Sequence, residues 1–206
     1  MAILQHTLGI FLHPESEWQS IRKQRREGFM GVFVSHVPFL ALIPVICAYI
    51  GVTAVGWQVG SDEVVRLTSV SAASLCFLSY VGINLGVYVF GEFISWMERT
   101  FGVKDGAEER HYEGTAMAVY VTTPLMIAGL SLLYPSPWLV TSVMGIAGVY
   151  SVYLLYQGIP ILMNIPKDQG FIFASSAVTT GLVLMVTMMI ASVIVWTVGI
   201  GPVYVS

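Results

Sequence analysis

The sequence predicts an all-α membrane protein, a bundle of five transmembrane helices preceded by short amphipathic N-terminal helices. Composition and the distribution of charge carry this prediction. Of the 206 residues, 56% are hydrophobic and only 10% are charged, with a mean hydropathy of +0.78. Soluble domains carry roughly 25% charged residues, so this composition is typical of a membrane protein. The charges are also confined to short segments that separate long apolar runs.

The charge-free runs define the expected spans. Residues 28–61 and 67–91 each allow one crossing, because about 20 apolar residues span a bilayer. Residues 114–166 are too many for one crossing, and two prolines within 134–138 break the run into two. Residues 169–206 supply the last crossing. We therefore expect one membrane domain over 28–206, with spans at 29–55, 67–96, 113–133, 138–160 and 171–198.

Residues 1–27 form a separate amphipathic segment that we expect to lie at the membrane interface. Its apolar first twelve residues are too few to span a bilayer, and Pro14 starts a second, more polar helix. Trp18 and Ile21 are expected to face the membrane surface. A basic cluster is expected to face lipid headgroups, anionic ones included: Arg22, Lys23, Arg25 and Arg26. Fixing the topology and binding a specific lipid or protein are both open roles for it.

The positions of Lys and Arg predict the orientation. If the N-terminus is cytoplasmic, eight of the nine basic residues fall in cytoplasmic segments and only Arg66 falls outside. The positive-inside rule therefore predicts a cytoplasmic N-terminus and a C-terminus on the other side. It places the connection between the fourth and fifth spans, with Lys167 and Asp168, in the cytoplasm.

Three polar residues within the predicted spans are candidates for a cavity or polar site. Glu92 is the acid that falls inside a predicted span, and His36 and Asn84 are the other polar candidates. Ionisable groups are costly in a bilayer, so Glu92 is a candidate ligand for a proton or cation, alone or with His36. The alternatives are an interfacial carboxylate beside a base and a single hydrogen-bonded histidine.

Small residues and prolines predict how the helices pack. Gly82 and Gly86 have the GxxxG spacing, and Gly91 extends this strip of small residues, which lets the second span approach another helix closely. Pro38 and Pro44 in the first span and Pro124 in the third are expected to kink their helices. These kinks either line a cavity or reflect irregular packing.

The segment from Tyr150 to Phe173 joins the last two spans. Tyr153 and Tyr156 follow Tyr150 at intervals of three, so the three hydroxyls lie along one side of a helix. We expect Gly158 and Pro160 to end that helix. Structural packing and a polar lining for a pore or lipid groove are both open roles for the tyrosines.

Several functions have no support in the sequence. It contains no HExxH, GxSxG, Walker or CxxC motif and no pair of intramembrane aspartates. We therefore expect no enzymatic activity, no cofactor and no metal site. The nine Lys and Arg residues do not form the basic face that nucleic-acid binding needs.

Three segments resemble the Yip family, five-span membrane proteins named for their interaction with Ypt/Rab GTPases. They are HPESEWQSI at residues 13–21, VYVTTPLMIAGL at 119–130 and YLLYQGIPILMNIPKDQGFIFA at 153–174. The chain is most similar to the bacterial branch, small multi-pass proteins of the inner membrane. The family positions carried onto this sequence are Pro124, Tyr153, Tyr156, Gly158, Pro160 and Pro166.

This resemblance implies a helical bundle that acts through lipids or protein partners. Eukaryotic members have a longer hydrophilic N-terminal region, linked to Rab binding, than residues 1–27 provide. We therefore expect a non-enzymatic scaffold or adaptor, whose partners are membrane lipids, an unidentified protein or further copies of the chain. The alternative is a small-ion or solute transporter or channel, with a cavity between kinked helices near Glu92 and His36.

Overall fold

The computed structural model describes residues 9–11, 13–23, 29–58, 64–100 and 107–205. These residues are almost entirely helical, and they contain two isolated antiparallel bridges but no longer strand. The helices are α2 (Pro14–Lys23), α3 (Phe29–Ile50), α4 (Ser69–Thr100), α5 (Ala107–Ala128), α6 (Pro137–Met163) and α7 (Lys167–Thr197), with a π-helical turn η1 (Gly51–Val55) after α3 and a 3-10 turn η2 (Gly129–Leu133) after α5.

Five helical segments are long and apolar enough to cross a membrane, which confirms the predicted five-helix bundle. Within the described residues they are His36–Val55, Ser69–Thr100, Glu113–Leu133, Pro137–Met163 and Lys167–Thr197. They follow the order of the predicted spans. The fourth and fifth helices nevertheless meet at a tighter connection than predicted, because α6 extends to Met163 and α7 begins at Lys167.

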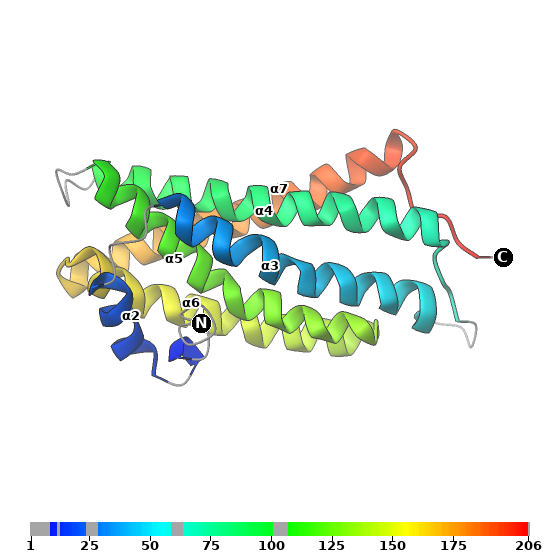
Figure 1. The fold of residues 1–206 in the computed structure, drawn as a ribbon, viewed down its shortest axis with the longest axis horizontal. Helices are drawn as coiled ribbons and strands as arrows, with labels where there is room; N and C mark the ends of the chain where they lie inside the picture. The colour runs from blue at the N-terminus through cyan, green and yellow to red at the C-terminus, as the bar shows by residue number, and fades with distance from the viewer. Residues whose placement is uncertain (1–8, 12, 24–28, 59–63, 101–106, 206) are drawn as a thin grey trace.

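Helix α5 forms the centre of the bundle. Figure 1 shows it behind α3 and between α4 and α6, and it contacts all three of these helices. It is the most buried of the five spans. Helix α7 lies at the edge against α6 and α4, and it leaves most of its apolar side chains exposed to face lipid.

The closest contact between α4 and α5 occurs at Gly91 and Gly114. A Cβ added to Gly114 would lie 2.8 Å from both the Gly91 carbonyl oxygen and the Ser95 amide nitrogen. At Gly82 and Gly86 an added Cβ would only reach ordinary contact with Met188, at 3.8 Å. The close approach predicted for α4 from its strip of glycines therefore occurs at the Gly91 end of the strip, and the GxxxG pair makes only ordinary contact with α7.

Two of the prolines that lie within helices are buried in the bundle. Pro44 of α3 fits against Gly129, where α5 tightens into η2, and a Cβ at Gly129 would lie 2.7 Å from the Pro44 Cα. Pro124 is buried within α5. These two prolines therefore shape helix packing in the middle of the bundle.

The C-terminal segment folds back onto the connection between α3 and α4. Gly199, with φ of +94°, turns the chain after α7. The Thr68 N–H then donates to the Val203 carbonyl at 2.8 Å. The Ser71 hydroxyl donates to the Gly201 carbonyl and accepts from the Val203 N–H, both at 3.0 Å. The chain end is thus held at the opposite end of the bundle from α2 (Figure 1).

Candidate functional site

The family-like segment forms an elbow, residues 158–170, between α6 and α7. Gly158 provides a notch in α6 that receives the indole ring of Trp18 from α2. A Cβ at Gly158 would lie 2.6 Å from Trp18 Cε2 and 3.0 Å from Met117 Cε. The Trp18 side chain is fully buried there, and its ring meets the Tyr120 ring edge-on at 6.2 Å. Glycine is thus required at position 158 because a helix from outside the bundle packs directly on the backbone.

Pro160 packs on the other side of the elbow. Its ring meets Gly170 of α7, where an added Cβ would lie 3.0 Å from Pro160 Cγ. The expectation that Gly158 and Pro160 end α6 is wrong, because the helix continues to Met163. A proline within a helix removes one backbone hydrogen bond, but here α6 continues past it and the proline ring packs against α7. The chain leaves the helix at Asn164.

Asn164 ends α6 in the left-handed conformation, with φ of 55° and ψ of 46°. Its N–H and that of Ile165 both donate to the Pro160 carbonyl, the pattern of a left-handed C-cap. Pro166 then precedes α7, and its carbonyl accepts the Gly170 N–H at 2.9 Å. The sharp reversal of the chain therefore depends on one residue with positive φ.

We expect Asn164→Ala to lower the free energy of unfolding by about 1 kcal/mol, because an alanine Cβ is unfavourable in the left-handed region. Asn164→Gly is the matched control and should be neutral or slightly stabilising, since glycine adopts positive φ without strain. Thermal unfolding of both variants in detergent measures the difference. Equal melting temperatures for the two variants would contradict this account of the elbow.

The three tyrosines of α6 contact different neighbours. The Tyr150 hydroxyl donates to the Ile10 carbonyl at 2.9 Å. The Tyr156 hydroxyl lies 2.8 Å from the Ser175 hydroxyl of α7. Tyr153 is 46% exposed on the outer face of the bundle and packs against the Tyr150 ring. Two of the three therefore hold segments together, one the N-terminal residues and the other α7.

Part of the predicted basic cluster belongs to the same assembly. Arg22 Nη1 donates to the Ile161 carbonyl at 3.3 Å, in the last turn of α6, where a cation is favoured by the helix dipole. Lys23 is exposed. Arg25 and Arg26 lie outside the described residues. Trp18 and Ile21 are buried on the bundle instead of facing the membrane surface, and the Gly158 notch accommodates Trp18.

His36, Asn84 and Glu92 lie on α3 and α4. His36 is 3% exposed, and its Nε2 is 3.5 Å from the Tyr120 hydroxyl. The Tyr120 ring thus connects His36 to Trp18. Asn84 donates to the Tyr80 carbonyl of its own helix at 2.8 Å, and Glu92 is half-buried. Among the described residues no three His, Cys, Asp or Glu side chains gather into a group that could hold a metal ion.

Two acids that the sequence did not single out are the most buried among those whose burial the structure describes. Glu98 and Glu113 are each 1% exposed, at the end of α4 and near the start of α5. The sequence places them at the edges of spans, where acids usually reach headgroup water. Glu113 directly precedes Gly114, and Glu98 follows Ser95 by three residues, so both acids adjoin the place where α4 and α5 pack closely. Small residues at positions 91, 95 and 114 were the available signal for this contact.

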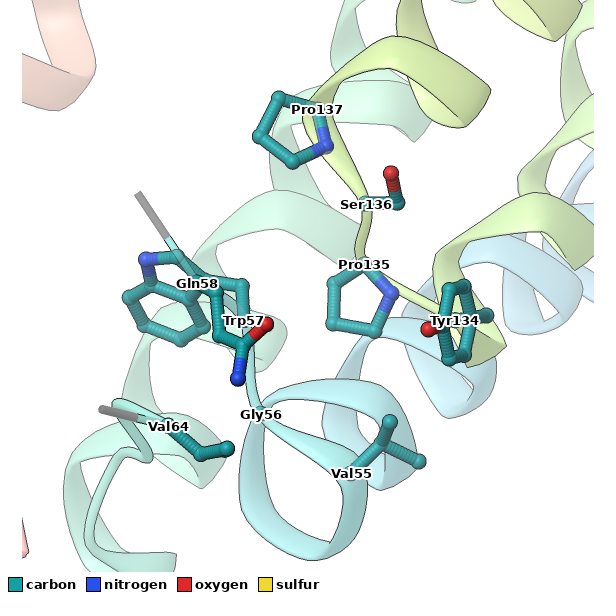
Figure 2. A pocket seen from close by; sticks show the side chains of 9 residues that line it. All are labelled: Val55, Gly56, Trp57, Gln58, Val64, Tyr134, Pro135, Ser136 and Pro137. Carbon is teal, nitrogen blue, oxygen red and sulfur yellow. The ribbon is translucent and has the colours of Figure 1, made fainter. Parts of the chain in front are cut away.

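A cavity of about 300 Å³ lies at the end of the bundle opposite α2. Figure 2 shows its two walls, residues 55–58 with Val64 on one side and residues 134–137 on the other. Trp57 and Tyr134 supply the aromatic lining, and Gln58 and Ser136 supply polar groups. None of the predicted cavity residues lines it.

Comparison with known proteins supports the family indicated by the elbow. The Yip1 domain matches residues 8–188. The chain is 36% identical over 193 residues to the inner membrane protein YohC of Escherichia coli strain K12, an alignment that covers 94% of this chain and 96% of the relative. The protein of the same name in E. coli O6:H1 gives the same values. No solved structure matches the chain. The chain therefore belongs to the Yip1 domain family, as a multi-pass protein of the bacterial inner membrane.

Proposed function

We propose that the protein is a non-enzymatic membrane adaptor that binds a lipid or protein partner through the surface formed by α2 and the elbow. The docking of Trp18 into the Gly158 notch is the observation that carries this proposal. It places a short polar helix against the end of α6, beside the chain reversal that leads into α7.

The docked helix turns a polar face outward. The exposed residues of α2 include Glu15, Gln19 and Lys23, and the adjoining elbow exposes Lys167 and Asp168. Buried apolar anchors with exposed polar and charged groups form a surface suited to recognition, since polar rims set specificity. The distribution of Lys and Arg predicts that this surface faces the cytoplasm.

Site-specific photo-crosslinking in bacterial membranes tests the proposal. A photo-reactive residue at Gln19 or Gln169, both exposed, should recover a reproducible protein or lipid adduct. The same residue at Val193, an exposed position on α7, is the matched control and should recover only bulk lipid. Adducts that do not differ among the three positions would refute the adaptor function.

A variant set identifies the groups responsible. Replacing Lys23, Arg25 and Arg26 by Gln should reduce the adduct at Gln19 several-fold if charge recruits the partner. Arg22 is kept in this variant because it caps α6, so that loss of the adduct does not reflect a displaced helix. An unchanged yield of the adduct would show that the basic cluster takes no part in binding the partner.

A second candidate function is the movement of protons or small cations through the bundle. The burial of Glu98 and Glu113 within two spanning helices favours it, because carboxyl groups inside a membrane protein commonly mark ion paths. Ion flux into proteoliposomes, reduced at least tenfold by Glu98→Gln but not by Glu92→Gln, would support it. Equal flux in protein-containing and empty vesicles would exclude it.

A further inference from the structure

The N-terminal strap, residues 9–11 and 13–23, is held along α6 at three separate points. Tyr150 donates to the Ile10 carbonyl at 2.9 Å. Trp18 occupies the Gly158 notch, and Arg22 donates to the Ile161 carbonyl at 3.3 Å. Among the helices, α2 makes its main contacts with α6. The strap therefore lies mainly on α6, at the beginning of the elbow, and the Trp18 ring also reaches α5, through Tyr120. It can leave α6 without separating the spans.

The docked position gives the Trp18 indole N–H no partner among the residues that the structure describes. The side chain is fully buried, and within the described part of the chain its Nε1 has no hydrogen-bond acceptor. Beside the notch, the buried Oε1 of Gln157 likewise has no donor there. A buried polar group without a partner destabilises the docked state. At a membrane interface the indole ring would lie among acyl chains and its N–H would reach water or headgroups.

The Arg22 contact points to the ligand that competes with α6. Its guanidinium donates to a neutral carbonyl at 3.3 Å. The phosphate of an anionic lipid, whose negative charge no choline group offsets, attracts the same group and offers it shorter, charge-assisted and bidentate hydrogen bonds. Lys23 is already exposed next to Arg22. Anionic lipid therefore binds the Arg22 and Lys23 end of the strap more strongly than α6 does.

We propose that the strap is a latch controlled by anionic lipid. In zwitterionic membranes it stays docked on α6, with Trp18 in the notch. In anionic membranes Arg22 and Lys23 move to lipid phosphates, Trp18 enters the interface and the notch opens. Glu15 and Glu17 lie in the first turn of α2, at the far end from Arg22. Because anionic lipid repels these acids, the released helix lies with its Lys23 end deeper among the headgroups.

This inference goes beyond the proposed adaptor function, because it concerns what controls the strap and requires no partner. Release of the strap also affects the elbow. Docked Arg22 satisfies a carbonyl in the last turn of α6, and release removes that cap at the point where Pro160 packs on Gly170. A released strap therefore frees the junction between α6 and α7.

Double electron–electron resonance on the full chain in nanodiscs tests the latch. Cys47 and Cys76 are replaced by Ala, and spin labels are placed at Gln19→Cys on α2 and Gln169→Cys on α7, both exposed. In pure phosphatidylcholine we expect one distance. With about 40 mol% phosphatidylglycerol, a second, longer and broader component should grow several-fold, and high salt should reverse it.

Two variants make the result decisive. Gly158→Ala fills the notch and should show the second component in both lipids. Lys23→Gln leaves the described α6 contacts intact and should lower the response to phosphatidylglycerol at least twofold. A wild-type distance that is the same at every phosphatidylglycerol content overturns the latch, and so does a second component that grows equally without anionic lipid. A single distance in Gly158→Ala also overturns it, because the strap would then accept a filled notch without leaving α6.

Discussion

Gly114→Ala is expected to lower the free energy of unfolding by about 3 kcal/mol, at the upper end of what overpacking a core produces. The new Cβ would lie 2.8 Å from the Gly91 carbonyl oxygen and from the Ser95 amide nitrogen, and closer still to the Ser95 hydroxyl. The first two are backbone atoms of α4, so a change of rotamer cannot remove the collision. Helices α4 and α5 must therefore move apart, in the most buried part of the bundle.

A matched alanine separates this steric effect from the general effect of replacing glycine in a helix. Gly145 of α6 has no atom within 4 Å of an added Cβ. Gly145→Ala should therefore be neutral or stabilising by up to about 1 kcal/mol through helix propensity. Thermal unfolding of the two variants in the same detergent measures the difference. A melting temperature for Gly114→Ala as high as that of Gly145→Ala would show that α4 and α5 are not in backbone contact at this position.

The sequence was sufficient to predict the spans and their order. Charge-free runs separated by turn residues are a strong signal, because a charged residue in lipid is costly and a helix that crosses the membrane needs a minimum length. The pair Pro135 and Pro137 correctly separated the third span from the fourth. These features depend on single segments, which is why the sequence alone reveals them.

Features that depend on two segments were harder to predict. An amphipathic helix with Trp18 and Ile21 on one side fits a membrane surface and a protein notch equally well, and the choice depends on Gly158, far away in the sequence. Pro160 was expected to end α6, but its packing on Gly170 allows the helix to continue to Met163. Burial of Glu98 likewise depends on the packing of a second helix.

Gly158→Ala is expected to displace α2 while leaving the five-helix bundle folded. The added Cβ would lie 2.6 and 2.8 Å from Cε2 and Cζ2 of the Trp18 ring. The Met117 Cε, at 3.0 Å, belongs to a flexible side chain and can move. The indole is rigid, so α2 must rise from α6, at about 2 kcal/mol of lost docking energy. Hydrogen exchange should become at least tenfold faster over residues 14–23 and stay unchanged in α5.

A double-mutant cycle with Trp18→Leu assigns the effect to the contact between the two side chains. Leucine is smaller than tryptophan and leaves room for the Cβ at position 158, so Gly158→Ala should cause little further loss in the Trp18→Leu background. The two substitutions should then couple by about 2 kcal/mol, as residues in direct contact do. If the effects of the two substitutions on the free energy of docking were additive, glycine at position 158 would be needed for the backbone of α6 and not for the docking of α2. Because the notch is formed by a missing side chain, filling it is the most direct test of what it holds.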